Sequence, residues 1–86
     1  MEHLKEIGEY NGTLGNLAED IGDLRYDALA EFIGLLSVKI YKDALKDKLR
    51  KRSQLSGALF EISSQLEDAQ EIIKDAWKIC KPCMDK

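Results

Sequence analysis

Apolar residues recur every three or four positions between Leu55 and Cys80, a spacing typical of one face of a long amphipathic helix. The positions that point away from this stripe are polar except for Phe60, so the pattern predicts both the helix and the face that it buries. Ser53 is the best N-cap for this helix, with Ser56 second, and Pro82 is expected to end it. The stripe consists of Leu55, Leu59, Ile62, Leu66, Ala69, Ile73, Ala76 and Cys80.

Two further helical patterns precede this stripe. After Thr13, a suitable N-cap, the same spacing is repeated by Leu14, Leu17, Ile21, Leu24 and Ala28. Residues 28–41 are apolar on nearly all sides, which predicts a central helix covered by several neighbours, and residues 42–52 are amphipathic. Asp27 either caps a second helix or lies inside one helix that spans residues 13–51, and the pattern leaves both interpretations open.

The predicted fold is all-α, an up-down bundle built from a long helical hairpin with two or three helices per chain. The chain must reverse near residues 51–56, because one straight helix to residue 80 would leave both stripes uncovered. We expect a polar lead-in over residues 1–12, a helical domain over 13–80 and a tail over 81–86. One partner helix cannot cover the apolar segment 28–41, so a homodimer or larger bundle is predicted. The expected interface and core residues are Phe32, Leu36, Leu55, Leu59, Ile62, Leu66, Ile73 and Trp77.

Length and composition narrow the class of protein. Eighty-six residues form one domain, and 44% hydrophobic with 34% charged residues argues against disorder. The net charge of −3 gives no general reason to expect nucleic-acid binding. No apolar run is long enough to span a bilayer and no signal peptide is visible, so we expect a cytoplasmic protein without a membrane partner.

Charge is nevertheless segregated along the chain. Residues 16–31 carry five acidic side chains against Arg25, a net charge of −4. Residues 42–52 carry six basic side chains against Asp43 and Asp47, a net charge of +4. Arg50, Lys51 and Arg52 are therefore candidates for contact with phosphate or with an acidic partner, and they can instead form a solvated turn or complement the acidic segment of a neighbouring subunit.

Asp20, Asp23 and Asp27 are spaced for one face of a helix. Together with Glu6 and Glu9, two of them form the pairs Glu6-x-x-Glu9 and Asp20-x-x-Asp23. This arrangement resembles the helical nucleotide pyrophosphatases, which bind magnesium with paired carboxylates. The resemblance implies a metal-dependent phosphohydrolase, although Asp replaces Glu and glycines flank the first pair. A solvated helix face accounts for the same residues.

The sequence Cys80-Lys81-Pro82-Cys83, with Trp77 three residues before it, resembles a thioredoxin-like redox motif. In thioredoxins the motif opens a helix, whereas here it closes one, and no βαβ pattern surrounds it. Two such pairs in a symmetric dimer would instead supply four thiolates to zinc, with His3 as a further ligand. A third interpretation places Cys80 in the core and Cys83 in an exposed tail.

These observations favour a non-enzymatic interaction or assembly module that associates with itself, or with another helical protein. A single histidine at position 3 cannot supply a serine-protease type of catalytic set, and the glycines are not spaced as a phosphate-binding loop. We therefore expect no catalytic residues and no cofactor, with the phosphohydrolase and the thiol-based zinc or redox protein as alternatives.

Overall fold

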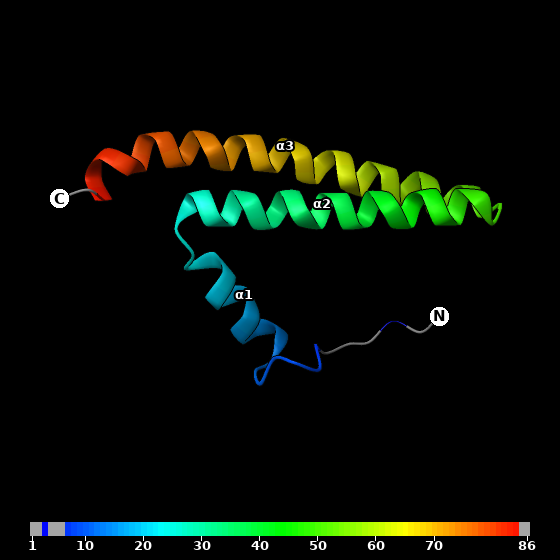
Figure 1. Ribbon diagram of the computed structural model, residues 1–86, viewed down its shortest axis with the longest axis horizontal. Helices are drawn as coiled ribbons and strands as arrows, with labels where there is room; N and C mark the ends of the chain where they lie inside the picture. The colour runs from blue at the N-terminus through cyan, green and yellow to red at the C-terminus, as the bar shows by residue number, and fades with distance from the viewer. Residues whose placement is uncertain (1–2, 4–6, 85–86) are drawn as a thin grey trace.

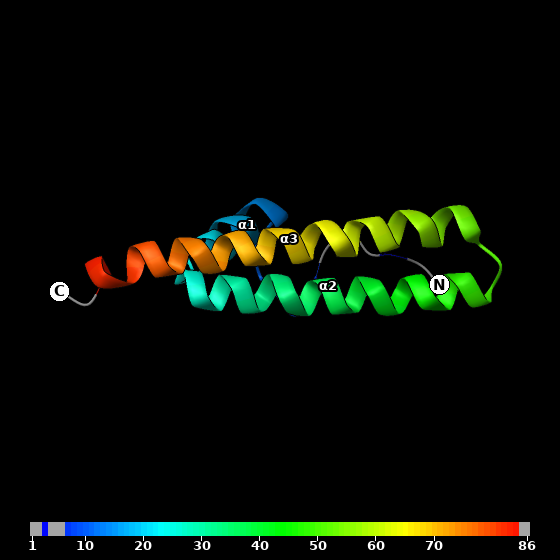
Figure 2. The same cartoon turned by 90° about the horizontal axis from the view of Figure 1, so that it is seen from above.

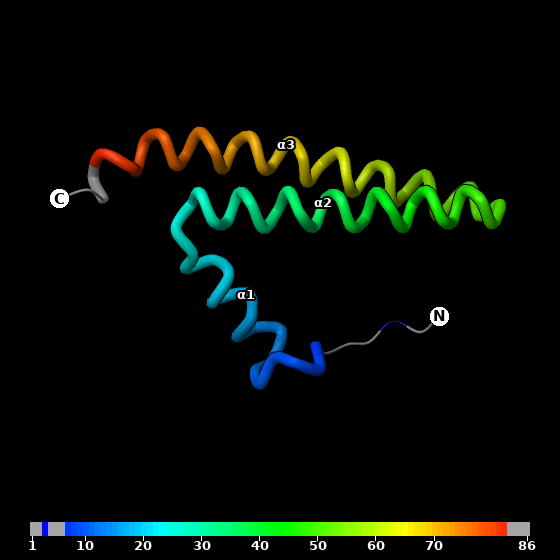
Figure 3. The backbone as a smooth tube through the Cα atoms, in the orientation of Figure 1, coloured from blue at the N-terminus to red at the C-terminus, as the bar shows by residue number. Residues whose placement is uncertain are grey.

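The computed structural model describes residue 3 and residues 7–84, and it confirms the all-α class. The described part contains three helices, α1 (Leu14–Gly22), α2 (Tyr26–Leu49) and α3 (Ser53–Met84), as Figure 1 shows. Helices α2 and α3 run antiparallel along the length of α2 (Figures 1 and 2), and nearly all contact between helices is between these two. Helix α1 leaves the pair at the start of α2 and does not pack along it (Figure 3).

The line of closest contact between α2 and α3 consists of small residues. Ala30, Ser37 and Ala44 are the buried residues of α2, and Ser56 and Ser63 are buried on α3. Residues seven apart lie on the same face of a helix, so these residues form one continuous seam. We call this line the small-residue seam.

Hydrogen bonds across the small-residue seam show how closely the helix backbones approach. The Ser37 hydroxyl donates to the carbonyl of Ser63, and the Ser63 hydroxyl donates to the carbonyl of Ser37, each over 3.0 Å. Two turns further along, the Gln70 side-chain amide donates to the carbonyl of Ala30 over 3.0 Å. A side chain as short as serine can reach the main chain of the opposite helix only where small residues let the two backbones approach closely.

The seam corrects the expected packing. The leucine stripe of α3 was expected to face the partner helix directly, and residues 28–41 to be covered on several sides. Instead the stripe lies beside the seam, and α2 is covered within the chain mainly by α3. The Ser37 and Ser63 hydroxyls donate to the opposite backbone, and the Ser56 hydroxyl donates to the Ser53 carbonyl of its own helix, so burying them carries no uncompensated desolvation cost.

The break between α1 and α2 settles the question that the sequence left open. Thr13 caps α1 as expected: its hydroxyl accepts from the Asn16 backbone amide, and the Asn16 side chain accepts from the Thr13 backbone amide. Helix α1 ends at Gly22, and α2 begins at Tyr26 with Arg25 in the cap position. Asp27 therefore lies in the first turn of α2, where a negative charge is favourable.

The chain reverses at residues 50–52 without a glycine. Lys51 takes a left-handed conformation with φ of 61°. Its amide donates to the carbonyl of Lys48, and the amide of Arg52 donates to the carbonyl of Asp47. This is the hydrogen-bond pattern of a Schellman motif, with lysine at the position that glycine usually occupies. Helix α3 follows at once, with Ser53 as its first residue rather than its cap.

Pro82 does not end α3, so that prediction is wrong. The helix continues to Met84, and Pro82 lies inside its last turn. Proline there removes one amide donor, and near the end of a helix of 32 residues this loss affects only the final turn. No helix in the described part of the chain is long and apolar enough to cross a membrane.

Candidate interaction surface

The seam divides the α2–α3 pair into two sides, which can be identified from one aromatic contact. Successive residues of a helix are turned by about 100° around its axis, so each residue can be placed to one side or the other of the seam. Tyr41 lies to one side of the seam residues of α2, and Phe60 lies to one side of those of α3. Their rings meet edge to face with centroids 5.4 Å apart, so these two flanks share a side. The flanks that carry Leu36 and Leu66 must therefore share the opposite side.

We call this opposite side the apolar face. Its residues come from both helices and follow one another along nearly the whole pair. They are Leu29, Phe32, Ile33, Leu36 and Ile40 from α2, and Leu55, Leu59, Ile62, Leu66, Ile73 and Trp77 from α3.

All eight residues that the sequence suggested for an interface lie on the apolar face. Phe32, Leu55 and Ile62 are 37%, 45% and 46% exposed, and the other five are half-buried. An open hollow at its edge on α3 is lined by Ala58, Glu61, Ile62, Gln65 and Leu66. The face is therefore wide, continuous and accessible to solvent.

The chain does not bury its large apolar side chains by itself. Among the described residues the only buried hydrophobic ones are Ala30 and Ala44. The accessible surface is 7154 Å², against about 5100 Å² expected for a compact monomer of this mass. The radius of gyration is 15.6 Å, against about 12 Å for a compact domain of this length. The fold within one chain therefore leaves unusually much surface exposed.

One end of the apolar face is held by contacts around Arg25. Its guanidinium lies 5.3 Å from the centre of the Trp77 ring and also binds the Asp27 carboxylate through two hydrogen bonds of 2.7 and 2.8 Å. The bond from Arg25 lowers the pKa of Asp27, and the Ala28 amide contributes to the same shift. These contacts connect the start of α2 to the second half of α3 and fix Trp77 at the end of the face.

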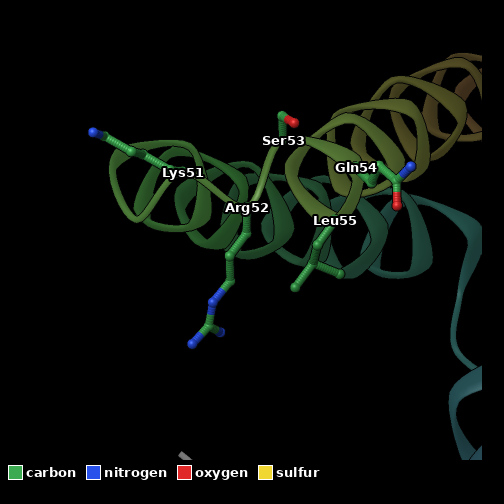
Figure 4. A pocket seen from close by; sticks show the side chains of 5 residues that line it. All are labelled: Lys51, Arg52, Ser53, Gln54 and Leu55. Atoms are coloured by element: carbon green, nitrogen blue, oxygen red, sulfur yellow. The ribbon is translucent and has the colours of Figure 1, made fainter.

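The basic residues Arg50, Lys51 and Arg52 lie at the reversal between α2 and α3, which we call the basic tip. An open hollow there is lined by Lys51, Arg52, Ser53, Gln54 and Leu55. Figure 4 shows that the Lys51 and Arg52 side chains extend in different directions. Arg52 lies 3.6 Å from the Asp47 carboxylate. The side chains therefore present spread positive charge rather than a cradle for one phosphate group.

The carboxylates do not form the helix face expected for a magnesium site. Asp20 lies on α1 and accepts a hydrogen bond from the Tyr10 hydroxyl, which raises the pKa of Tyr10. Asp23 caps the end of α1, and Asp27 lies on α2 bound to Arg25. The helix break at residues 23–25 separates the three residues. Glu9 is exposed in a turn, and Glu6 lies outside the described residues.

The thiol and histidine candidates are only partly described. Cys80 is a free, half-buried cysteine on α3, and the side chain of Cys83 lies outside the described part. His3 is exposed. Among the described residues, no group of three or more His, Cys, Asp and Glu side chains is placed to hold a metal ion.

Sequence reasoning missed the residues of the small-residue seam. Ser37, Ser63 and Gln70 were assigned no role, Ser56 was considered only as a second N-cap candidate, and Gly34 was taken as part of an apolar helix. A signal was present, because Ala30, Ser37 and Ala44 are spaced by seven, as are Ser56, Ser63 and Gln70. Serines at such positions read as surface residues until the opposite backbone is known.

Comparison of the chain with protein-family models, with curated proteins and with solved structures finds no match.

Proposed function

We propose that this protein is a non-enzymatic assembly module that forms a homodimer through its apolar face. In this dimer two α2–α3 pairs make a four-helix bundle, with the small-residue seam inside each pair and the apolar face between the pairs. A two-fold axis makes the contact self-complementary, so each chain contributes the same residues.

The observation that carries the proposal is that no large apolar side chain is buried within the described part of the chain, while eleven residues make a continuous apolar face. Exposed apolar patches of this extent are uncommon on monomers and mark interaction surfaces. The accessible surface of the whole chain exceeds that of a compact monomer by about 2000 Å², and a dimer interface of ordinary size, about 800 Å² on each chain, would remove part of this excess.

The experiment compares one substitution on the apolar face with the same substitution on the outer side of α3. Ile62→Glu places a charge in the centre of the face, and burying that charge in an interface carries a large penalty. Ile72→Glu is the matched control, because Ile72 is 68% exposed and points away from both the seam and the face. We expect a solution mass of twice 9.7 kDa for the natural chain and for Ile72→Glu, and of 9.7 kDa for Ile62→Glu.

Sedimentation equilibrium measures these masses directly, and circular dichroism of each variant checks that the helices remain. A natural chain that stays monomeric up to about 100 μM, which corresponds to a binding free energy near −5.5 kcal/mol, contradicts the proposal. A dimer that Ile62→Glu and Ile72→Glu leave equally intact shows that the chains associate through a different surface.

A further inference from the structure

The two ends of the α2–α3 pair carry opposite charge. The basic tip lies at the reversal, where the adjoining end of α2 adds Lys46 and Lys48. At the other end, the acidic segment comprises α1, the break and the start of α2, with Glu19, Asp20, Asp23, Asp27 and Glu31. Figure 1 shows these segments at opposite ends of α2.

The two charged ends of one chain cannot neutralise each other. Helix α2 has 24 residues and is therefore about 36 Å long. This length exceeds the screening distance of about 8 Å at physiological ionic strength several-fold. Arg52 has a local partner in Asp47, and Asp27 has one in Arg25. Among the described residues, Glu19, Asp23, Arg50 and Lys51 take part in no ion pair of this kind.

Helix α1 also has an apolar stripe that the α2–α3 pair does not bury. Leu14, Leu17 and Ile21 of α1, and Leu24 just after it, follow a 3-4 spacing. Leu14 and Leu24 are 59% and 40% exposed, Leu17 and Ile21 are half-buried, and α1 contains no buried residue. An amphipathic helix of nine residues needs tertiary contact to be stable in water. This stripe is thus a second apolar surface without a cover in the described part of the chain, and it lies on the acidic segment.

We propose that the two chains of the dimer lie antiparallel, so that α1 of each chain packs against the basic tip of its partner. This inference rests on the proposed dimer and adds its orientation and a second contact. An antiparallel arrangement brings each acidic segment beside a basic tip, whereas a parallel arrangement would place like charges together at both ends. The occupant of the α1 stripe is therefore a second copy of this chain.

Charge reversal tests the proposed contact between the acidic segment of one chain and the basic tip of its partner. Glu19→Lys with Asp23→Lys reverses the acidic segment, and Arg50→Glu with Lys51→Glu reverses the basic tip. Each pair of substitutions is expected to weaken the dimer about tenfold at low salt, and their combination is expected to restore it to within about threefold of the natural chain. Asp68→Lys, an exposed position on the outer side of α3, serves as the control for added positive charge and is expected to leave the dimer unchanged.

If the two charge reversals instead weaken the dimer additively, the chain with both reversals dimerises about a hundredfold more weakly than the natural chain. This result would overturn the antiparallel arrangement but not the dimer itself. Absence of any dimer in the natural chain overturns the proposed function instead. The two failures are therefore distinguishable in one series of sedimentation measurements.

Disulfide trapping gives an independent readout in a chain with Cys80→Ser and Cys83→Ser. A chain that also carries Asp23→Cys and Lys51→Cys is expected to form covalent dimers on mild oxidation, and a chain with Lys51→Cys alone is expected to form none. These two positions lie at opposite ends of one chain, so the bond must join two chains. Efficient dimers from Lys51→Cys alone would indicate parallel chains and overturn the proposal.

Discussion

At the scale of single residues, the contact between α2 and α3 depends on side chains that are small and fully hydrogen bonded. Ser37 and Ser63 are each 2% exposed, and each donates to the carbonyl of the other. Each of these hydroxyls contributes about 1 kcal/mol to the free energy of unfolding through its hydrogen bond. Their small volume matters more, because a larger side chain would force the two backbones apart.

We therefore expect Ser63→Leu to lower the free energy of unfolding by about 3 kcal/mol, since overpacking adds to the loss of the hydrogen bonds. Ser63→Ala loses only the hydroxyl and is expected to cost about 1 kcal/mol. Urea unfolding followed by circular dichroism at one fixed protein concentration measures both values. Ser64→Leu, on an exposed neighbouring position, is the control. A Ser63→Leu chain as stable as the Ser64→Leu chain would contradict this account of the seam.

At the scale of the helices, Gly34 shows how the register of α2 against α3 is held. A Cβ atom at Gly34 would lie 2.2 Å from the Gln70 amide nitrogen, the atom that donates to the Ala30 carbonyl. Glycine inside a helix costs about 1 kcal/mol relative to alanine. Glycine at this position lowers the helix propensity of α2 but leaves space for the Gln70 side chain to reach the backbone of α2.

This arrangement predicts a coupling between the two positions. Gly34→Ala alone is expected to be neutral or destabilising, because it displaces Gln70 from Ala30. In a Gln70→Ala background the same substitution is expected to stabilise the chain by about 1 kcal/mol, since only helix propensity then changes. Gly57→Ala, which has open space around its Cβ position, is the control and is expected to stabilise both backgrounds equally. Equal effects of Gly34→Ala in both backgrounds would exclude the proposed contact as the cause.

At the scale of the whole molecule, the chain is an elongated pair of helices with the apolar face along one side and oppositely charged ends, and exposed apolar residues such as Val38, Tyr41 and Leu45 lie on the other side. Its principal dimensions are 53 × 29 × 14 Å. A pair of helices this thin leaves its large apolar side chains half-buried or exposed, and in the proposed dimer the second chain supplies the missing burial. Folding and association are then one coupled process under the proposed function.

Coupling predicts that the melting temperature rises with protein concentration. Between 2 and 200 μM a monomer keeps one melting temperature, whereas a dimer that unfolds to two chains gains stability from mass action. We expect an increase of several degrees over this range in calorimetry, and a smaller increase or none for Ile62→Glu. A melting temperature independent of concentration for the natural chain would show that the helices are stable without association.

The sequence by itself determined the helical elements and the reversal between them. The 3-4 spacing of apolar residues predicted helix over residues 13–51 and 53–80, and Thr13 marked the first cap, because both signals act within a few residues along the chain. Whether residues 13–51 form one helix or two stayed open, and the structure shows the break between α1 and α2. Helical periodicity also aligned the six expected interface residues of α3, whereas the contact of Tyr41 with Phe60 showed that Phe32 and Leu36 of α2 share their side. The end of α3 was misplaced because a proline in the last turn of a long helix costs too little to end it.

Only the tertiary structure decided which part of each helix meets the other. Propensity and hydrophobicity favour leucine over serine at a helix contact, yet Ser37 and Ser63 lie in the seam because each finds a carbonyl on the opposite backbone. The pairing of Gln70 with Ala30 spans 40 positions, and the contact of Arg25 with Trp77 spans 52. Such contacts depend on the register between two helices, which local sequence signals do not encode, and the apolar face stays exposed as a consequence of that register.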